Sequence, residues 1–233
     1  MKKVVIFDLD GTLINSLPDI AGSMNRVLAA NRLPIHPVDA YKRFTGDGAR
    51  VLAQRALGNR QDMLDKVLAA YAADYAQNSR VDTRPYEGMA DALKRLSDGG
   101  YAVCVYSNKD DADTQNVVSH FFPDIAFAAV QGRQDGLPLK PDPTAVLGMA
   151  RTLGCPPEAI WYCGDTVTDM RCAKNAGMRS IAVTWGFQPE ADLRAMLPDY
   201  VAHSAEALCA IIESADKTFK IEGKGCAGGR AGI

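Results

Sequence analysis

Two pairs of aspartates stand out because each pair follows a short apolar run. Asp8 and Asp10 come directly after the run Val-Val-Ile-Phe at residues 4–7, and Asp165 and Asp169 follow a second such run. A carboxylate at the end of a buried strand is unfavourable unless a cation or hydrogen-bond donors neutralise it. A few carboxylates, completed by water and a substrate phosphate, are the ligands that Mg²⁺ prefers. The two pairs together therefore predict a magnesium site.

Each motif also has a simpler explanation. The segment 8–12, Asp-Leu-Asp-Gly-Thr, could be a polar turn with a capping aspartate. An EF-hand loop does not fit, because Gly11 comes too early and a strand rather than a helix precedes the segment. Asp165 and Asp169, one helical turn apart, could be acids at a helix N-terminus that the helix dipole favours. The presence of both motifs in one chain favours a shared cluster.

Two further polar segments lie at or near predicted strand ends. Lys140 precedes Pro141, which restricts the backbone of its loop, and Ser107 and Asn108 end the strand predicted at residues 101–106. Taken alone, Lys140 would be a solvated surface lysine and Ser107 a helix N-cap. Because ligands of parallel α/β sheets bind at the carboxyl ends of the strands, we expect these side chains to meet the aspartates.

The elements that must position these residues alternate between strands and helices after residue 85. The alternation predicts an α/β fold with a Rossmann-like, doubly wound parallel sheet that is covered on both faces. Helices are expected at 111–120 and 167–176, between strands, and at 206–214, after the last strand. Strands are expected at residues 4–7, 101–106, 125–130, 159–163, 180–184 and 200–202.

The segment between the first two strands differs from the rest of the chain. It carries helical apolar stripes from Pro18 to Tyr75 and no strand signal, which predicts an inserted α-helical domain. We therefore expect a core domain of residues 1–14 and 82–216 and a helical cap domain of residues 15–81. The remaining residues, 217–233, end in a Gly-rich stretch and are predicted to form a flexible tail.

The bulk composition excludes several classes of protein. The 233 residues, 47% of them apolar, suffice for a core domain with a smaller insert. A formal net charge of −2 with mixed signs leaves no basic footprint for nucleic acid or a membrane surface. Six cysteines without a Cys-x-x-Cys pair predict reduced thiols rather than a zinc site or a disulfide framework. No signal peptide or membrane span is read, so we expect a cytoplasmic protein.

The four motifs, in this order, resemble those of the haloacid dehalogenase superfamily, and the resemblance covers residues 3–215. A closer likeness is to its phosphoglycolate phosphatase branch, which carries a helical (C1-type) cap before the second motif. This chain departs from that branch at Asn15, at residues 131–133 and at Asp110. The segments that look like that branch are Pro18-Asp19-Ile20, Gly46-Asp47-Gly48, Arg55-Ala56-Leu57-Gly58, Tyr86-Glu87-Gly88, Asn108-Lys109 and Trp185-Gly186-Phe187.

The resemblance implies a phosphatase that uses Mg²⁺. Asp8 would be the nucleophile that forms an aspartyl-phosphate, and Asp10 the acid that protonates the leaving alkoxide and then activates water. A dehalogenase would need no such acid, so Asp10 favours phosphate chemistry. The implied metal-binding residues are Asp8, Asp10 (through its backbone carbonyl), Asp165 and, close by, Asp169. The residues implied to hold the phosphoryl oxygens are Thr12, Ser107, Asn108 and Lys140.

The substrate is expected to be a small phosphate ester, with 2-phosphoglycolate as the first candidate. Arg43 or Arg50 in the cap could pair with its carboxylate. A β-phosphoglucomutase-like phosphomutase, a pyrophosphatase or nucleotidase, and a non-catalytic module that keeps the fold remain as alternatives. We expect no nucleic-acid or membrane partner, and either a monomer or a homodimer.

Overall fold

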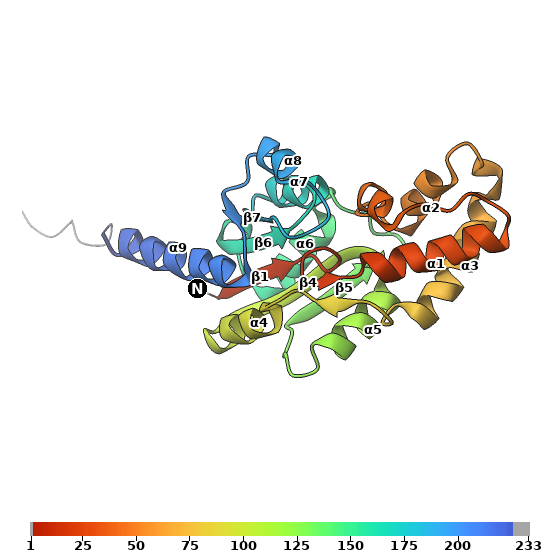
Figure 1. The fold of residues 1–233 in the computed structure, drawn as a ribbon. Helices are drawn as coiled ribbons and strands as arrows, with labels where there is room; N and C mark the ends of the chain where they lie inside the picture. Colours follow the sequence, from red (N-terminus) through yellow and green to blue (C-terminus); the bar gives the residue numbers. More distant parts are fainter. Residues whose placement is uncertain (1, 226–233) are drawn as a thin grey trace, which may run out of the picture.

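A parallel sheet forms the centre of the molecule. The structure is a computed structural model that describes residues 2–225, with side chains described up to residue 216. Within these residues, six strands pair in parallel in the order β5-β4-β1-β6-β7-β8, which confirms the predicted α/β class (Figure 1). The strands are β1 (Lys3–Phe7), β4 (Tyr101–Asp110), β5 (Ala129–Arg133), β6 (Ile160–Gly164), β7 (Arg179–Val183) and β8 (Tyr200–Ala202).

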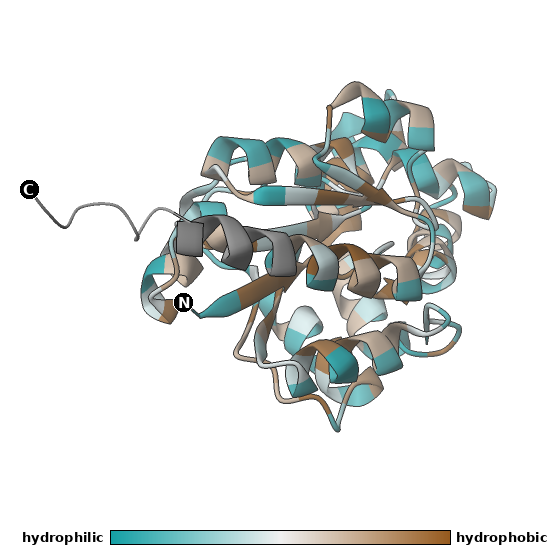
Figure 2. Ribbon diagram, turned by 90° about the vertical axis from the view of Figure 1, so that its left-hand side faces the viewer, coloured by the Kyte–Doolittle hydropathy of each residue, from teal (hydrophilic) through white to brown (hydrophobic). Residues whose placement is uncertain are grey.

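Helices cover both faces of this sheet, as the alternation along β1 shows. Val5 and Phe7 point into one apolar cluster, whereas Val4 and Ile6 point into another. Figure 2 shows hydrophobic strands in the middle of the molecule and helices with mixed colouring around them. The first cluster packs against α4 (Met89–Asp98), α5 (Asp111–Phe121) and α9 (Ala205–Gly225), and the second against α6 (Thr144–Leu153) and α7 (Val167–Ala176).

A group of helices between β1 and β4 lies beyond the carboxyl ends of these strands (Figure 1). We call residues 15–81 the cap. The cap helices enclose an apolar cluster of their own, in which Met24, Tyr41 and Val67 are buried, and Phe187 of the core packs into it. The elements of the cap are α1 (Leu17–Ala30), α2 (Ala49–Leu57), α3 (Leu64–Asn78) and 3₁₀ turns at Val38–Arg43 and Gln61–Met63.

The two connections between cap and core lie side by side. β2 (Ile14–Asn15) and β3 (Arg84–Pro85) pair as a short antiparallel ladder. Asp19, in the first turn of α1, is only 4% exposed. Its carboxylate accepts hydrogen bonds of 2.7 to 3.1 Å from the backbone N–H groups of Asp82 and Thr83 and from the Thr83 hydroxyl. This carboxylate therefore fixes the start of α1 to the returning chain.

Two predicted strands differ by several residues from those in the structure, and three others differ by one residue at one or both ends. The strand expected at 125–130 begins at Ala129, because the preceding residues form a loop whose Ile125 and Phe127 pack against the core without pairing. The strand expected at 101–106 continues to Asp110, past a shift in its register with β5. Ser107 therefore lies within β4 and is not a helix N-cap. Asp110 has that position and accepts a hydrogen bond from the backbone N–H of Ala112.

The C-terminal part of the chain holds more helix than the sequence predicts. The helix α8 (Glu190–Ala195) was missed because its single turn and a half shows no apolar period. The helix α9 runs to Gly225 rather than ending at residue 214, so residues 217–225 are not part of an irregular tail. Asp216 anchors this extension, since its carboxylate accepts hydrogen bonds from Tyr101 and Trp161. The rest of the predicted tail, 226–233, lies outside the described residues. No helix in the described part is long and apolar enough to span a membrane.

Replacing Asp19 tests whether its hydrogen bonds to residues 82 and 83 stabilise the connection between cap and core. Asp19→Ala leaves the N–H groups of residue 82 and of the buried Thr83 without their acceptor, and we expect it to lower the free energy of unfolding by about 2–4 kcal/mol. Asp19→Asn keeps one carbonyl oxygen and should lose less. Asp98→Ala removes a carboxylate that is 67% exposed and should change stability by no more than about 0.5 kcal/mol. Urea denaturation measures all three, and an equal effect of Asp19→Ala and Asp98→Ala would refute this role.

Candidate active site

Three buried carboxylates meet at the carboxyl edge of the sheet. Asp8 follows β1, Asp165 follows the neighbouring strand β6, and Asp169 lies in the first turn of α7. One carboxylate oxygen of each lies within 4.8 Å of those of the other two. The Lys140 ammonium lies 2.6 Å from Asp8 Oδ1 and 2.7 Å from Asp169 Oδ1. The structure therefore brings together three of the four predicted motifs, although they are far apart in the sequence.

The surrounding backbone fixes Asp165 and Asp169 in place. Asp169 closes a capping box: its Oδ2 accepts from the backbone N–H of Thr166 at 3.1 Å and from the Thr166 hydroxyl at 2.6 Å. Asp165 accepts from the hydroxyl of Thr12 at 2.9 Å and from the backbone N–H of Phe187 at 2.8 Å. Asp169 is thus a helix-capping acid and a member of the cluster at once, because its other oxygen, Oδ1, faces the lysine.

Two glycines make room for the Asp165 carboxylate. Gly11 has a φ of +90°, a conformation that other residues rarely adopt. A Cβ atom at Gly11 would collide with the carboxylate of Asp165, and a Cβ at Gly186 would collide with the same side chain. Glycine at these positions therefore permits the close approach of the first motif and of residues 185–187 to the cluster.

Asn108 holds the loop that carries Lys140. Its Oδ1 accepts from the backbone N–H of Lys140 at 2.9 Å, and its Nδ2 donates to the carbonyl oxygen of the same residue at 3.3 Å. The Nδ2 group also donates to the carbonyl oxygen of Gly46 in the cap at 3.0 Å. One amide side chain thus joins β4, the lysine loop and the cap.

Of the other predicted phosphate ligands, Thr12 contacts the cluster and Ser107 lies next to Asn108 in β4. Thr12 and Ser107 are both buried. The Thr12 hydroxyl donates to Asp165, and the Ser107 hydroxyl accepts from the backbone N–H of Lys109 at 3.2 Å. In this structure their side chains, like that of Asn108, contact protein groups, so their role in holding phosphate stays a prediction.

Asp10 contacts the start of the cap and a second lysine. Its Oδ1 accepts a hydrogen bond of 2.5 Å from the hydroxyl of Ser16, and its Oδ2 lies 2.8 Å from the Lys109 ammonium. Lys109 in turn donates to the hydroxyl of Tyr75 in α3 at 2.8 Å and lies 4.5 Å from the centre of that ring. Sequence reasoning had Lys109 only as part of a motif and Tyr75 only as part of an apolar helix stripe. A stripe gives no signal that one of its members contacts a distant lysine.

The two cap arginines that were predicted to meet the substrate lie on the surface. Arg43 is exposed. The side chain of Arg50 is 58% exposed, and its guanidinium donates to Asp65 of the cap at 2.9 Å. Among the described contacts of these two side chains, none reaches the aspartate cluster, and their role in binding substrate stays a prediction.

The three carboxylates of the cluster, when ionised, carry more negative charge than Lys140 can balance. Burial, reinforced by repulsion from Asp169, raises the pKa of Asp8 to about 7. Burial and the Asp8 carboxylate raise the pKa of Asp165 well above its usual value. Although burial opposes it, attraction to Asp169 and Asp8 raises the pKa of Lys140, which therefore stays charged. One lysine balances only one of three carboxylates, so the donor set fits a divalent cation.

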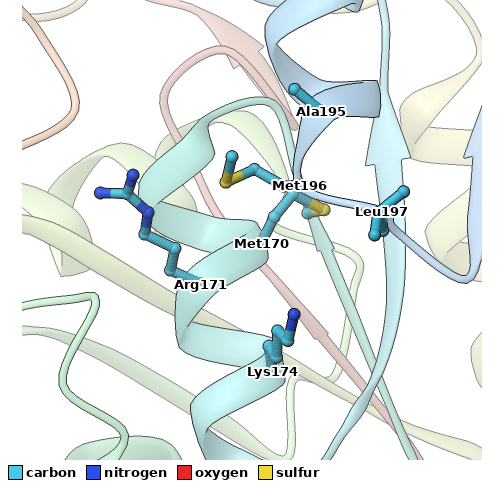
Figure 3. A pocket seen from close by; sticks show the side chains of 6 residues that line it. All are labelled: Met170, Arg171, Lys174, Ala195, Met196 and Leu197. Atoms are coloured by element: carbon cyan, nitrogen blue, oxygen red, sulfur yellow. The ribbon is translucent and has the colours of Figure 1, made fainter.

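A separate surface hollow of about 220 Å³ lies between α7 and α8 (Figure 3). It does not include the carboxylate cluster, although Met170 in its wall follows Asp169 in the sequence. The side chains that line it are Met170, Arg171, Lys174, Ala195, Met196 and Leu197.

Comparison with known proteins agrees with this arrangement. The haloacid dehalogenase-like hydrolase family matches residues 5–183. A phosphoglycolate phosphatase of Mesorhizobium japonicum is 31% identical over 227 residues, which cover 95% of this chain and 99% of that protein. A phosphoglycolate phosphatase of Haemophilus influenzae is 31% identical over 219 residues, which cover 90% of this chain and 98% of that protein. A crystal structure of a predicted phosphoglycolate phosphatase from Haemophilus somnus superposes with a TM-score of 0.85 at 28% identity. The superposition covers 90% of this chain and 97% of that one.

The family match extends from β1 to β7 and includes Asp8, Lys140, Asp165 and Asp169. Relatives of nearly equal length confirm the predictions of the family, of its fold and of a hydrolase of the phosphatase type. The chain belongs to the haloacid dehalogenase-like hydrolase family.

Proposed function

We propose that the protein is a Mg²⁺-dependent phosphatase that hydrolyses 2-phosphoglycolate to glycolate and phosphate through an aspartyl-phosphate on Asp8. The observation that carries this proposal is the position of Asp8 in a buried carboxylate cluster, hydrogen-bonded to Lys140. The names of the relatives from Mesorhizobium and Haemophilus support the substrate. Reaction with an anionic phosphate ester needs positive charge beside the nucleophile. Lys140 supplies one such charge, and the carboxylates can bind a cation that supplies more.

Asp8 and Asp165, with Asp169 nearby, are the residues that would hold Mg²⁺. When bound, the ion would neutralise phosphoryl oxygens and align them with the nucleophile. Lys140 orients the Asp8 carboxylate and adds a second positive charge at the same place. Thr12, Ser107 and Asn108 would contact the remaining phosphoryl oxygens.

The reaction then proceeds in two displacements. A carboxylate oxygen of Asp8 forms a bond to phosphorus while the bond from phosphorus to the ester oxygen breaks, and Asp10 gives its proton to that oxygen. In the second step, water attacks the phosphorus and transfers a proton to Asp10. The bond between phosphorus and the Asp8 oxygen breaks, which releases phosphate and restores both aspartates.

Asp8 is only 5% exposed, so we expect substrate to reach it after a movement of the cap. The contacts between cap and core include the hydrogen bond from Asn108 to Gly46 and one of 2.9 Å from Thr168 to Asp47. Opening would break these contacts, and closing would exclude water from the first displacement.

A reducing compartment such as the cytoplasm suits the cysteines of the described residues. They form no disulfide, and all are buried. Burial raises the pKa of Cys163 well above its usual value, so that this thiol stays protonated and unreactive.

The decisive assay measures phosphate release with Mg²⁺ from 2-phosphoglycolate, sugar phosphates, nucleotides and pyrophosphate. We expect the highest kcat/KM for 2-phosphoglycolate and a loss of about 10⁴-fold or more in Asp8→Asn, which lacks the nucleophile. Asp62→Asn, on the exposed surface of the cap, is the matched control and should keep full activity. Folded wild-type protein that releases phosphate from none of these esters would refute the proposal.

The pH dependence of thermal stability tests the metal site. Because the folded-state pKa of Asp8 lies near 7 instead of 3.8, the metal-free fold binds more protons than the unfolded chain and loses stability as the pH rises through this window. Mg²⁺ binds the ionised carboxylates, so it should raise the Tm more at pH 8 than at pH 5, by about 2–4 °C for each kcal/mol of binding. In Asp8→Asn the difference between the two pH values should shrink. Equal shifts at both pH values in the wild type would argue against these ligands.

A further inference from the structure

We propose that Lys109, together with Tyr75 of the cap, binds a carboxylate on the leaving group of the substrate. The inference rests on the proposed phosphatase function and narrows its substrate class to phosphate monoesters with a carboxylate close to the ester oxygen. It also assigns substrate recognition to the boundary between core and cap, rather than to the exposed arginines of the cap.

Lys109 is a buried cation outside the aspartate cluster. Its side chain is 7% exposed, against 2% for Lys140. Every other cation in the ion pairs described here has a side chain at least 23% exposed. Lys140 is held by Asp8 and Asp169, at the position of the phosphoryl group. Lys109 is therefore the ammonium that can serve a second anionic group.

The contact with Asp10 places Lys109 next to the leaving group. Asp10 must lie within a hydrogen bond of the ester oxygen in order to protonate it. The Lys109 ammonium lies 2.8 Å from Asp10 Oδ2. It is therefore next to the acid that would contact the ester oxygen, on the side of the leaving group. In 2-phosphoglycolate a single carbon separates the ester oxygen from the carboxylate. A substrate with this spacing brings its carboxylate within reach of Lys109.

Tyr75 completes a site with two donors. An ammonium has three N–H donors, and the phenol oxygen of Tyr75 accepts one of them at 2.8 Å, which leaves its own O–H to donate. Burial, and then the nearby charge of Asp10, raise the pKa of Tyr75 well above its usual value, so the hydroxyl stays protonated. A carboxylate that accepts from both Lys109 and Tyr75 would link the cap to the core only when the correct substrate is bound.

The test compares 2-phosphoglycolate with ethyl phosphate, which has a methyl group in place of the carboxylate. We expect Lys109→Met to lower kcat/KM for 2-phosphoglycolate by about 10- to 100-fold more than for ethyl phosphate, since one charge-assisted hydrogen bond is lost. Tyr75→Phe should lower the ratio of kcat/KM for 2-phosphoglycolate to kcat/KM for ethyl phosphate as well, but by less. Lys109→Arg keeps the positive charge and should retain most of the wild-type ratio. Lys42→Met removes an exposed cap lysine and should leave the ratio unchanged. Thermal denaturation of each variant verifies folding.

Several outcomes would overturn the inference. An equal loss for both esters in Lys109→Met would mean that Lys109 only positions Asp10 or holds the cap. A loss of preference in Arg43→Ala or Arg50→Ala, but not in Lys109→Met, would assign the carboxylate to the outer arginines. If the wild-type protein hydrolyses ethyl phosphate but not 2-phosphoglycolate, the proposed class of carboxylate-bearing substrates is refuted, whereas phosphatase activity itself is not. Wild-type protein that hydrolyses no ester would refute the proposed function itself.

Discussion

The placement of one buried ammonium between two buried carboxylates is the constraint on which the site depends. Lys140 offsets part of the repulsion among Asp8, Asp165 and Asp169, which could not otherwise lie so close together away from water. The two partners come from different motifs, so the ion pairs form only when the ends of β1 and β6 and the lysine loop are correctly assembled. The remaining unbalanced charge is what makes the site suitable for a cation.

Much of the surrounding fold can be understood as support for this cluster. The parallel sheet brings Asp8 and Asp165 to neighbouring strand ends, and the capping box of α7 sets the angle of Asp169. Asn108 holds the backbone of the lysine loop. These supports include hydrogen bonds between side chains and the backbone of buried segments, so they hold the carboxylates in place before any ligand arrives. The cap, in contrast, meets the core through Phe187, which packs into the apolar cluster of the cap, and through a few polar contacts that can be broken and remade.

The sequence predicted the cluster well and its surroundings less well. The aspartates and Lys140 were found because each carries its own local signal, an apolar run before a carboxylate or a proline beside a lysine. The role of Lys109 and Tyr75 depends on a contact between distant elements, which no periodicity reveals. The strand expected at residues 125–130 was displaced for a related reason, since Ile125 and Phe127 are buried by a loop and apolar character alone does not distinguish this from pairing.

The paired strands β2 and β3 mean that the chain leaves the core and returns to it at almost the same point. An insertion with adjacent ends resembles a long surface loop, so its contents can be exchanged between related proteins without altering the sheet. Such an exchange would not be wholly free here. A transplanted cap would need a hydroxyl where Tyr75 now stands, because the lysine that it serves belongs to the recipient. The contacts across the boundary between cap and core, this hydrogen bond among them, therefore limit such an exchange.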